Sequence, residues 1–209
     1  MQKKYESLIF DLDGTLWDAC PITAEAWNGK LHELGLEGEL TGDDIRSVAG
    51  LPQQVCIQTL LPEQMKQNPD LIAELTLSEQ AAIKEKGGEL FEGVAEGIKD
   101  LSKEYNLFIV SNCLEWYLKL FFERFKLKEY FTDWDCVGIS GLPKSEMIKN
   151  LIEMHQLKSP VYTGDTLGDE EASQGAGIDF IHAEYGFGRA KNPQESFNSF
   201  IELAEFFTK

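Results

Sequence analysis

The pattern of hydrophobic and polar positions changes twice along the chain. Residues 6–11, ESLIFD, form a short apolar run that predicts a buried strand. From about residue 18 to about residue 88, apolar positions have helical spacing, and glycine and proline separate the segments. After residue 94 strand and helix patterns alternate. We predict four further strands, at 106–111, 134–140, 160–165 and 178–183, and we expect the last of these to be the final strand of the chain. We predict helices at 94–105, 114–127, 144–157, 169–177 and 193–208.

This order of elements predicts an α/β fold. Alternating strands and helices favour a parallel sheet with helices on both faces. The first strand must join that sheet, because an isolated apolar strand is not stable. The all-helical block, in which we predict no strand, is then an insertion after strand one. We expect a core domain of residues 1–17 and 88–209 and a helical domain of residues 18–87.

Polar side chains gather at the predicted carboxyl ends of the strands, where open parallel sheets bind their ligands. The first strand ends at two aspartates, and the ends of the other predicted strands supply a hydroxyl, an amide, a lysine and two more carboxylates. They are Asp11, Asp13, Ser111, Asn112, Lys144, Asp165 and Asp169. Carboxylate oxygens suit Mg²⁺, and the ion would let like charges crowd without protonation. A carboxylate nucleophile, an acid/base carboxylate and a lysine together predict a phosphoryl-transfer site.

The motifs in this order resemble those of the haloacid dehalogenase superfamily. They are DLDGTL at 11–16, SN at 111–112, Lys144, and GDTLGD at 164–169. The segments FEGVAEGIKDL at 91–101, AGI at 176–178 and YGFG at 185–188 are similar to the phosphoglycolate phosphatase-like branch. The helical insertion resembles that superfamily's type 1 cap. The resemblance covers nearly the whole chain and implies a Rossmannoid core sheet with an inserted helical cap.

The resemblance also implies roles for the carboxylates. Asp11 would be the nucleophile and a metal ligand. Asp13 would be the general acid/base, with its backbone carbonyl on Mg²⁺. Asp165 would bind the metal directly, and Asp169 would act through water or by orienting Lys144.

The remaining core residues would handle the phosphate. The resemblance implies that Ser111 and Asn112 hold it. Lys144 would offset the negative charge of the nucleophile and the phosphate. The implied partner is therefore a small phosphorylated metabolite, and phosphoglycolate, a sugar phosphate, a nucleoside monophosphate and a cofactor precursor all remain open.

Asp13 favours phosphate ester chemistry over dehalogenation, because an alkoxide leaving group needs a proton and a halide does not. Leu12 stands where the ion-pumping ATPases of the superfamily have lysine. A mutase similar to β-phosphoglucomutase is the nearest alternative, but Thr15 and Gly164 favour hydrolysis. A signalling receiver domain is disfavoured by the helical insertion, and an inactive scaffold by the complete set of catalytic residues.

In the cap, the segment IRSVAGLP at 45–52 resembles a specificity loop, with Arg46 and Gly50 as candidate substrate-binding residues. Arg46 would bind a second anionic group of the substrate, or else pair with Asp43 or Asp44 on the surface.

Other residues near the motifs have two interpretations each. Trp17 and Trp116 either line the leaving-group pocket or pack in the core. We expect Cys113 to be inert, because no histidine is placed to activate it. Asp18 is expected to support the first loop or cap the following helix.

The histidines are interpreted as structural or surface residues. His32, His155 and His182 fall in no motif. The run DEEAS at 169–173, apart from Asp169, is interpreted as a solvated first helical turn.

Composition and net charge limit the classes of molecule that we expect this protein to bind. The chain has 209 residues and a formal net charge of -17, which argues against nucleic acid and anionic membranes. Four cysteines without a paired spacing suggest reduced thiols. No signal peptide or membrane span is recognised, so we expect a cytoplasmic protein. We also expect a monomer.

Overall fold

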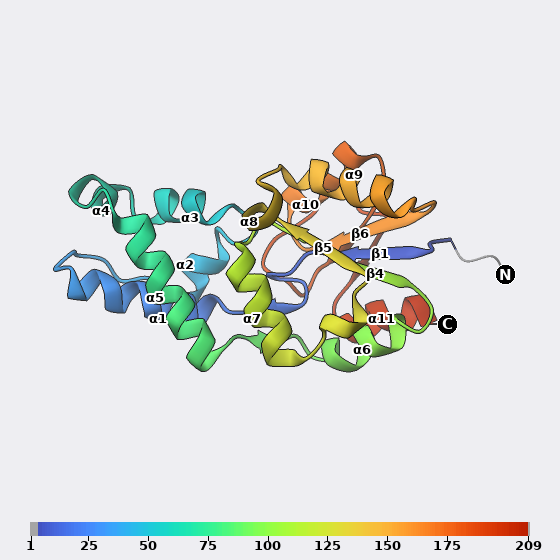
Figure 1. Cartoon of the computed structure of the whole chain (residues 1–209), viewed down its shortest axis with the longest axis horizontal. Coiled ribbons are helices and arrows are strands. Elements are labelled where there is room, and N and C mark those ends of the chain that lie inside the picture. Colours follow the sequence, from blue (N-terminus) through green and yellow to red (C-terminus); the bar gives the residue numbers. More distant parts are fainter. Residues whose placement is uncertain (1–3, 209) are drawn as a thin grey trace.

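A six-stranded parallel sheet forms the centre of the protein in a computed structural model that describes residues 4–208. The strand order is β5-β4-β1-β6-β7-β8, and every neighbouring pair is parallel (Figure 1). The strands are β1 (Ser7–Phe10), β4 (Asn106–Ser111), β5 (Asp133–Cys136), β6 (Pro160–Gly164), β7 (Asp179–Ala183) and β8 (Glu195–Phe197). The first strand joins this sheet, as predicted, and lies between β4 and β6.

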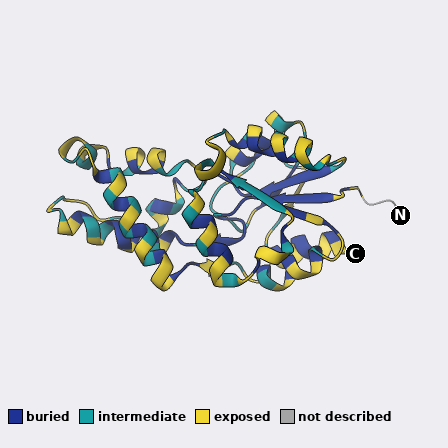
Figure 2. Ribbon diagram, in the orientation of Figure 1, coloured by how far each residue is buried: buried dark blue, intermediate teal, exposed yellow. Residues whose placement is uncertain are grey.

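Helices cover both faces of this sheet. They are α6 (Val94–Leu101), α7 (Glu115–Phe125), α8 (Val137–Ser140), α9 (Lys144–His155), α10 (Leu167–Ala176) and α11 (Phe200–Thr208), with a short 3-10 turn at Lys128–Tyr130. Side chains of β1 alternate between the faces: Leu8 and Phe10 pack with residues of α6 and α11, and Ile9 packs with residues of α9 and α10. Figure 2 shows the central strands buried and β5, at the edge, partly exposed. The predicted α/β class is confirmed.

The inserted helices form a second body of packed structure. They are α1 (Cys20–Glu33), α2 (Gly42–Arg46), α3 (Gln53–Leu60), α4 (Pro62–Gln67) and α5 (Leu71–Lys86), and they share their own hydrophobic cluster. A short antiparallel pair, β2 (Trp17–Asp18) and β3 (Glu89–Leu90), joins them to the rest of the chain. Figure 1 shows these helices extending beyond the carboxyl end of the sheet. The first three residues and the last residue of the predicted core lie outside the described residues.

Two element predictions are wrong in part. The strand expected at 134–140 ends at Cys136 and continues as α8, where the chain turns so that the N–H of Gly138 donates to the carbonyl of Cys113 at 3.1 Å. The helix expected at 193–208 begins only at Phe200, because residues 195–197 pair with β7 as the edge strand β8. Both elements depend on a neighbour that is distant in sequence, so local helix and strand patterns do not reveal them.

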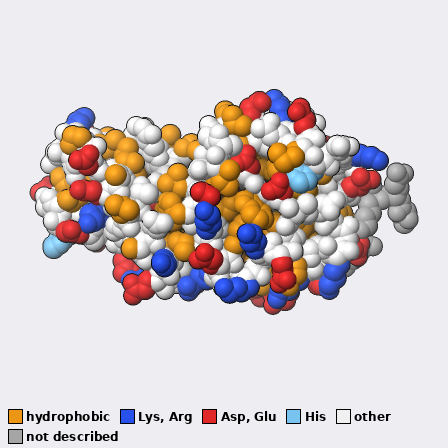
Figure 3. Space-filling view, viewed as in Figure 1, with side chains coloured by type: hydrophobic (Ala, Val, Ile, Leu, Met, Phe, Trp, Pro, Cys, Tyr) orange, Lys and Arg blue, Asp and Glu red, His pale blue; other side chains and the backbone are white. Residues whose placement is uncertain are grey.

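Charged side chains of both signs are scattered over the surface. On the face shown in Figure 3, hydrophobic side chains gather near the middle, over the region of α7 and β5, where Leu118, Phe122, Trp134 and Ile139 line a groove. Among the described residues, no helix is long and apolar enough to cross a membrane.

Candidate active site

The polar residues predicted from the strand ends come together at the carboxyl edge of β4, β1 and β6. Asp11 follows β1, Asp165 follows β6, and Asp169 lies in the first turn of α10. Lys144 begins α9. All four are almost fully buried, with relative exposures between 0% and 6%. A charged group is buried at high cost unless it is paired, so the contacts among these four residues decide what the site can do.

Asp11, Asp165 and Asp169 form a group of carboxylates whose facing oxygens all lie within 4.8 Å of one another. The ammonium group of Lys144 lies 3.0 Å from Oδ1 of Asp11 and 2.6 Å from Oδ1 of Asp169. Burial raises the pKa of Asp11 to about 6, although the charge of Lys144 opposes the shift. Burial and the charge of Asp169 raise the pKa of Asp165 well above its usual range. One lysine therefore does not offset three carboxylates.

Asp169 uses both of its oxygens in the protein. Oδ1 accepts from Lys144, and Oδ2 accepts from the backbone N–H and the hydroxyl of Thr166 at 3.0 and 2.7 Å. The bond from the Thr166 N–H is one half of the capping box that begins α10, and the N–H of Asp169 completes it by donating to the Thr166 hydroxyl oxygen at 3.2 Å. Burial would raise the pKa of Asp169, but the charge of Lys144 and these hydrogen bonds lower it overall. Asp169 is thus suited to fix Lys144 in place.

Backbone N–H groups of a loop bind one carboxylate oxygen of Asp165, Oδ2. The N–H groups of Phe187 and Gly188 donate to Oδ2 of Asp165 at 2.8 and 3.2 Å. Gly186 must be glycine, since a Cβ there would lie 2.3 Å from the Cβ of Asp165. His182, expected to be structural or at the surface, is buried with Nε2 3.1 Å from the carbonyl of Asp165. The segment at 185–188, noticed in the sequence only for its resemblance, thus positions this carboxylate.

These contacts leave two oxygens for a metal ion. Oδ2 of Asp11 and Oδ1 of Asp165 are buried and accept no hydrogen bond from residues 4–208. They belong to the same carboxylate group and are hard oxygen donors, which Mg²⁺ prefers. The residues present therefore fit the metal implied by the sequence.

Asp13 is not part of this carboxylate group and is held instead by Tyr117. The hydroxyl of Tyr117 donates to Oδ1 of Asp13 at 2.5 Å. Burial raises the pKa of Asp13 to about 7, and the hydrogen bond from Tyr117 limits that rise. A carboxyl with a pKa near neutrality is suited to both donate and accept a proton. Tyr117 was not predicted, because nothing in the local sequence marks a position on α7 that faces a residue 104 positions earlier.

The predicted phosphate-binding pair also lies at this edge. Ser111 is buried, and its hydroxyl oxygen accepts from the N–H of Cys113 at 3.3 Å. The side-chain amide of Asn112 donates to the carbonyl of Gly50 at 2.7 Å. Gly50 has a left-handed φ of 84°, which favours glycine. The predicted specificity loop therefore touches the core next to the strand ends.

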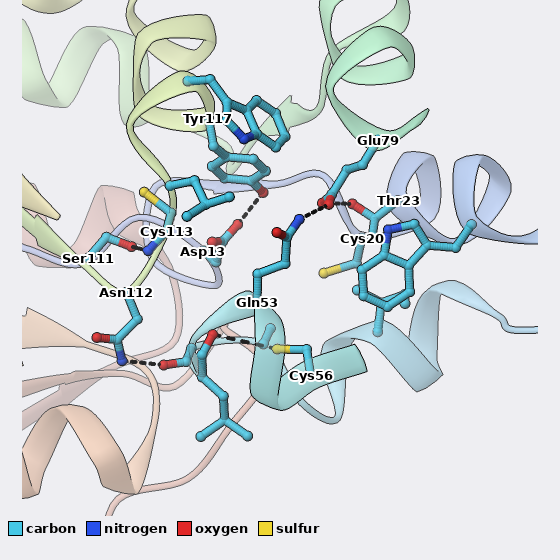
Figure 4. A pocket seen from close by; sticks show the side chains of 17 residues that line it. Asp13, Cys20, Thr23, Gln53, Cys56, Glu79, Ser111, Asn112, Cys113 and Tyr117 are labelled. Atoms are coloured by element: carbon cyan, nitrogen blue, oxygen red, sulfur yellow. Dashed lines mark hydrogen bonds between the residues drawn. The ribbon is translucent and has the colours of Figure 1, made fainter. Parts of the chain in front are cut away.

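A cavity of about 80 Å³ lies between the inserted helices and the core, as Figure 4 shows. Asp13, Ser111 and Asn112 line it from the core side. Its lining from the inserted helices and the loop includes the following polar or aromatic residues: Thr23, Trp27, Gln53 and Glu79. Drug-sized ligands need cavities of several hundred Å³, so this one suits a much smaller group.

Four other residues near the motifs were also interpreted from the sequence. Trp116 lines the cavity, which was one of its two interpretations, and Cys113 lines the cavity as well. Trp17 is fully buried against Tyr117, Phe121 and Phe125, so it packs in the core and does not line the cavity. Asp18 accepts a hydrogen bond from the N–H of Cys20 at 2.8 Å and supports the start of α1, as predicted.

The contacts of Arg46 differ from those expected if it binds the substrate. Its guanidinium pairs with Asp18 at 2.6 Å and with Asp43 at 2.5 Å, and it is not among the residues lining the cavity. The alternative of an arginine paired with an aspartate of its own helix matches the contact with Asp43. The pairing with Asp18 was not predicted, because the two residues are 28 positions apart.

One interpretation of the acidic run at 169–173 is wrong. Glu170 is 2% exposed, and its carboxylate accepts from the backbone N–H groups of Lys191 and Asn192 at 2.6 and 3.1 Å. A solvated helical turn was expected here. Glu170 instead holds the loop that follows β7.

A parallel sheet with an inserted helical body and buried carboxylates at its edge is found in a family of hydrolases. Residues 8–183 match the family model described as haloacid dehalogenase-like hydrolase, and the chain belongs to that family. A phosphoglycolate phosphatase of Psychrobacter arcticus is 27% identical over 97% of this chain and 95% of its own length. One of Aquifex aeolicus is 28% identical over 86% of this chain and 85% of its own length.

A solved structure from Haemophilus somnus, described as a predicted phosphoglycolate phosphatase, has the same fold. Its TM-score is 0.85 at 20% identity, and the match covers 99% of both chains. The resemblance inferred from the motifs is confirmed, and the enzyme class predicted from the sequence, a phosphatase-type hydrolase, agrees with these relatives.

Proposed function

We propose that the protein is a Mg²⁺-dependent phosphatase that hydrolyses a small phosphomonoester through phosphoryl transfer to Asp11. The observation that carries the proposal is the buried carboxylate group: Asp11 and Asp165 present free oxygens beside the ammonium of Lys144. The names of the curated relatives support the same class of substrate.

Asp11, Asp165 and the backbone carbonyl of Asp13 would hold the metal, with Asp169 nearby. Bound Mg²⁺ would neutralise charge on the phosphoryl oxygens and keep the carboxylates ionised. Lys144, fixed by Asp169, would contribute positive charge on the other side of Asp11. Ser111 and Asn112 would bind the phosphoryl group at the end of β4.

The reaction would proceed in two steps. In the first, an oxygen of Asp11 attacks phosphorus, the ester P–O bond breaks, and Asp13 donates its proton to the departing oxygen. In the second, Asp13 takes a proton from water, whose oxygen attacks the phosphoryl group and releases Asp11 and inorganic phosphate. Tyr117 holds the carboxyl of Asp13 in position for both transfers.

The inserted helices, residues 18–87 in the predicted division, would act as a cap over this site. The contact between Gly50 and Asn112 supports this arrangement, because it joins the cap loop to the phosphate-binding pair. We further expect the protein to act as a monomer.

The test is phosphate release from p-nitrophenyl phosphate by the wild type and by Asp11→Asn, each with Mg²⁺ and with EDTA. We expect turnover only in the wild type with Mg²⁺, and a loss of at least about 1000-fold for Asp11→Asn, since the nucleophile is removed. Full activity of Asp11→Asn with Mg²⁺ would sink the proposal. An intact protein that isomerises glucose 1-phosphate without releasing phosphate would establish the mutase alternative.

A further inference from the structure

The cavity beside Asp13 has an unusual charge balance for an enzyme that binds anions. Among its described lining residues are two carboxylic acids, Asp13 and Glu79, and no lysine, arginine or histidine. Lys144 lies between Asp11 and Asp169 and Arg46 is held by Asp18 and Asp43, and neither lines the cavity. Any part of the substrate beyond the phosphate would therefore meet two carboxyl groups and no cation.

Glu79 is the central polar group of the wall contributed by the inserted helices. It is 6% exposed and accepts from the hydroxyl of Thr23 at 2.9 Å and from the side-chain amide of Gln53 at 2.5 Å. Within residues 4–208 it forms no ion pair, and burial raises its pKa to about 7. Figure 4 shows Glu79 and Gln53 facing the same space as Asp13.

Two tryptophans on the cavity wall carry buried indole N–H groups. The Nε1 atoms of Trp27 and Trp116 have no acceptor in full hydrogen-bonding geometry among the described residues. The N–H of Trp27 nevertheless interacts with Glu79 and lowers the pKa of that carboxyl. The wall thus offers acceptors on Glu79 and, on Trp116, a donor without an acceptor.

These groups discriminate among three kinds of leaving group. A carboxylate offers no donor, finds no cation on the wall and is repelled by Glu79 when that carboxyl is ionised. An ammonium group would pair with an ionised Glu79, but it offers no acceptor, so it would leave an indole N–H group unpaired. A hydroxyl group both donates and accepts, so it satisfies both sides of the wall without adding charge.

We propose that the substrate is the phosphate ester of a compact, uncharged, hydroxyl-bearing molecule, whose hydroxyl donates to Glu79 and accepts from the N–H of Trp116. This inference rests on the proposed phosphatase function and narrows its substrate class. The proposed substrate class differs from that of a phosphatase whose substrate carries a carboxylate beside the phosphate. Buried polar groups of this kind select strongly against ligands that leave them unpaired.

The first test compares three esters of similar size with the full chain and Mg²⁺: glycerol 3-phosphate, 2-phosphoglycolate and phosphoethanolamine. Their leaving groups carry a hydroxyl, a carboxylate and an ammonium group, respectively. We expect kcat/KM for glycerol 3-phosphate to exceed each of the others at least tenfold. A kcat/KM for 2-phosphoglycolate or phosphoethanolamine that equals or exceeds that of glycerol 3-phosphate overturns the inference.

The second test changes the wall. In Glu79→Gln the ratio of kcat/KM for glycerol 3-phosphate to that for 2-phosphoglycolate should fall about tenfold, because the repulsion of the carboxylate is removed. Glu85→Gln is the matched control, since Glu85 is an exposed residue of the same helix. Trp116→Phe, which keeps the ring and removes the donor, should raise KM for glycerol 3-phosphate about fivefold. If both cavity variants behave like Glu85→Gln, the proposed contacts are wrong.

p-Nitrophenyl phosphate separates the two levels of the proposal. Hydrolysis of this ester that depends on Asp11, together with no preference for glycerol 3-phosphate, overturns only the substrate class. No phosphate release from any of the four esters by a folded protein with Mg²⁺ overturns the phosphatase function, and the substrate class falls with it.

Discussion

Lys144 shows how a single residue organises the site. Its ammonium group lies between Asp11 and Asp169, and the carboxylates raise its pKa although burial acts in the opposite direction. Removing one partner of a buried ionic cluster is costly, because the charges left behind cannot be solvated.

We expect Lys144→Met to lower the free energy of unfolding by about 3–5 kcal/mol at pH 7. Urea unfolding followed by circular dichroism measures this change. Lys149→Met is the control, because Lys149 forms an exposed pair with Glu146 on the same helix. That pair should be worth less than about 1 kcal/mol. Equal effects of the two substitutions would contradict the buried ionic cluster.

Glu79 predicts a pH dependence of stability. Burial raises its pKa from an ordinary value of 4.5 to about 7, so the folded state binds a proton more tightly than the unfolded state does. Its contribution is therefore favourable below about pH 4.5 and is lost as the pH rises through 7. The loss is at most about 3 kcal/mol.

Unfolding of the wild type and of Glu79→Gln at pH 5 and at pH 8 measures this contribution. We expect the wild type to lose stability relative to Glu79→Gln between the two values. The opposite sign, a relative gain by the wild type at pH 8, would mean that Glu79 is ionised at no cost in the folded state.

At the scale of elements, Glu170 links α10 to the loop that follows β7. Its carboxylate accepts from two backbone N–H groups of residues 191 and 192. Hydrogen bonds to a charged acceptor are each worth about 1.5–3 kcal/mol. Glu170 was predicted to be solvated because it belongs to an acidic run at the start of a helix, but only its neighbour Glu171 is exposed.

Glu170→Gln should therefore lower the free energy of unfolding by about 1–3 kcal/mol, since an amide is a weaker acceptor and presents a donor to a donor. Glu171→Gln on the same turn should change it by less than about 0.5 kcal/mol. Thermal unfolding of both variants tests the difference. Destabilisation by Glu171→Gln of the same size would show that helix-end charge, rather than the loop contact, is the cause.

At the scale of the whole molecule, the buried carboxylates should couple metal binding to stability. Mg²⁺ that binds only the folded state stabilises it by about 2.7 kcal/mol at 100 times its dissociation constant. We expect saturating Mg²⁺ to raise the melting temperature of the wild type and EDTA to reverse the rise. Asp165→Asn should abolish the response, because Asp165 supplies one of the two free oxygens. A response kept in Asp165→Asn would place the ion elsewhere.

The sequence alone determined most of the order of the core elements and which polar residues end the strands at the candidate site. Apolar strand patterns end at Asp11, Ser111 and Asp165, and parallel strands must bring those ends to one edge of the sheet. The helical spacing of residues 18–88 likewise predicted a helical insertion without a strand, and the short pair β2 and β3 lies at its two ends. These features are encoded locally, by period and by the residue types that follow each strand.

Only the tertiary structure decided which distant groups meet. Tyr117 reaches Asp13, Glu170 reaches the loop after β7, and β8 exists because β7 offers it an edge. The wall of Glu79 and the two tryptophans is assembled from separate helices in the same way. No periodicity encodes such contacts, because each depends on how elements far apart in the chain pack together.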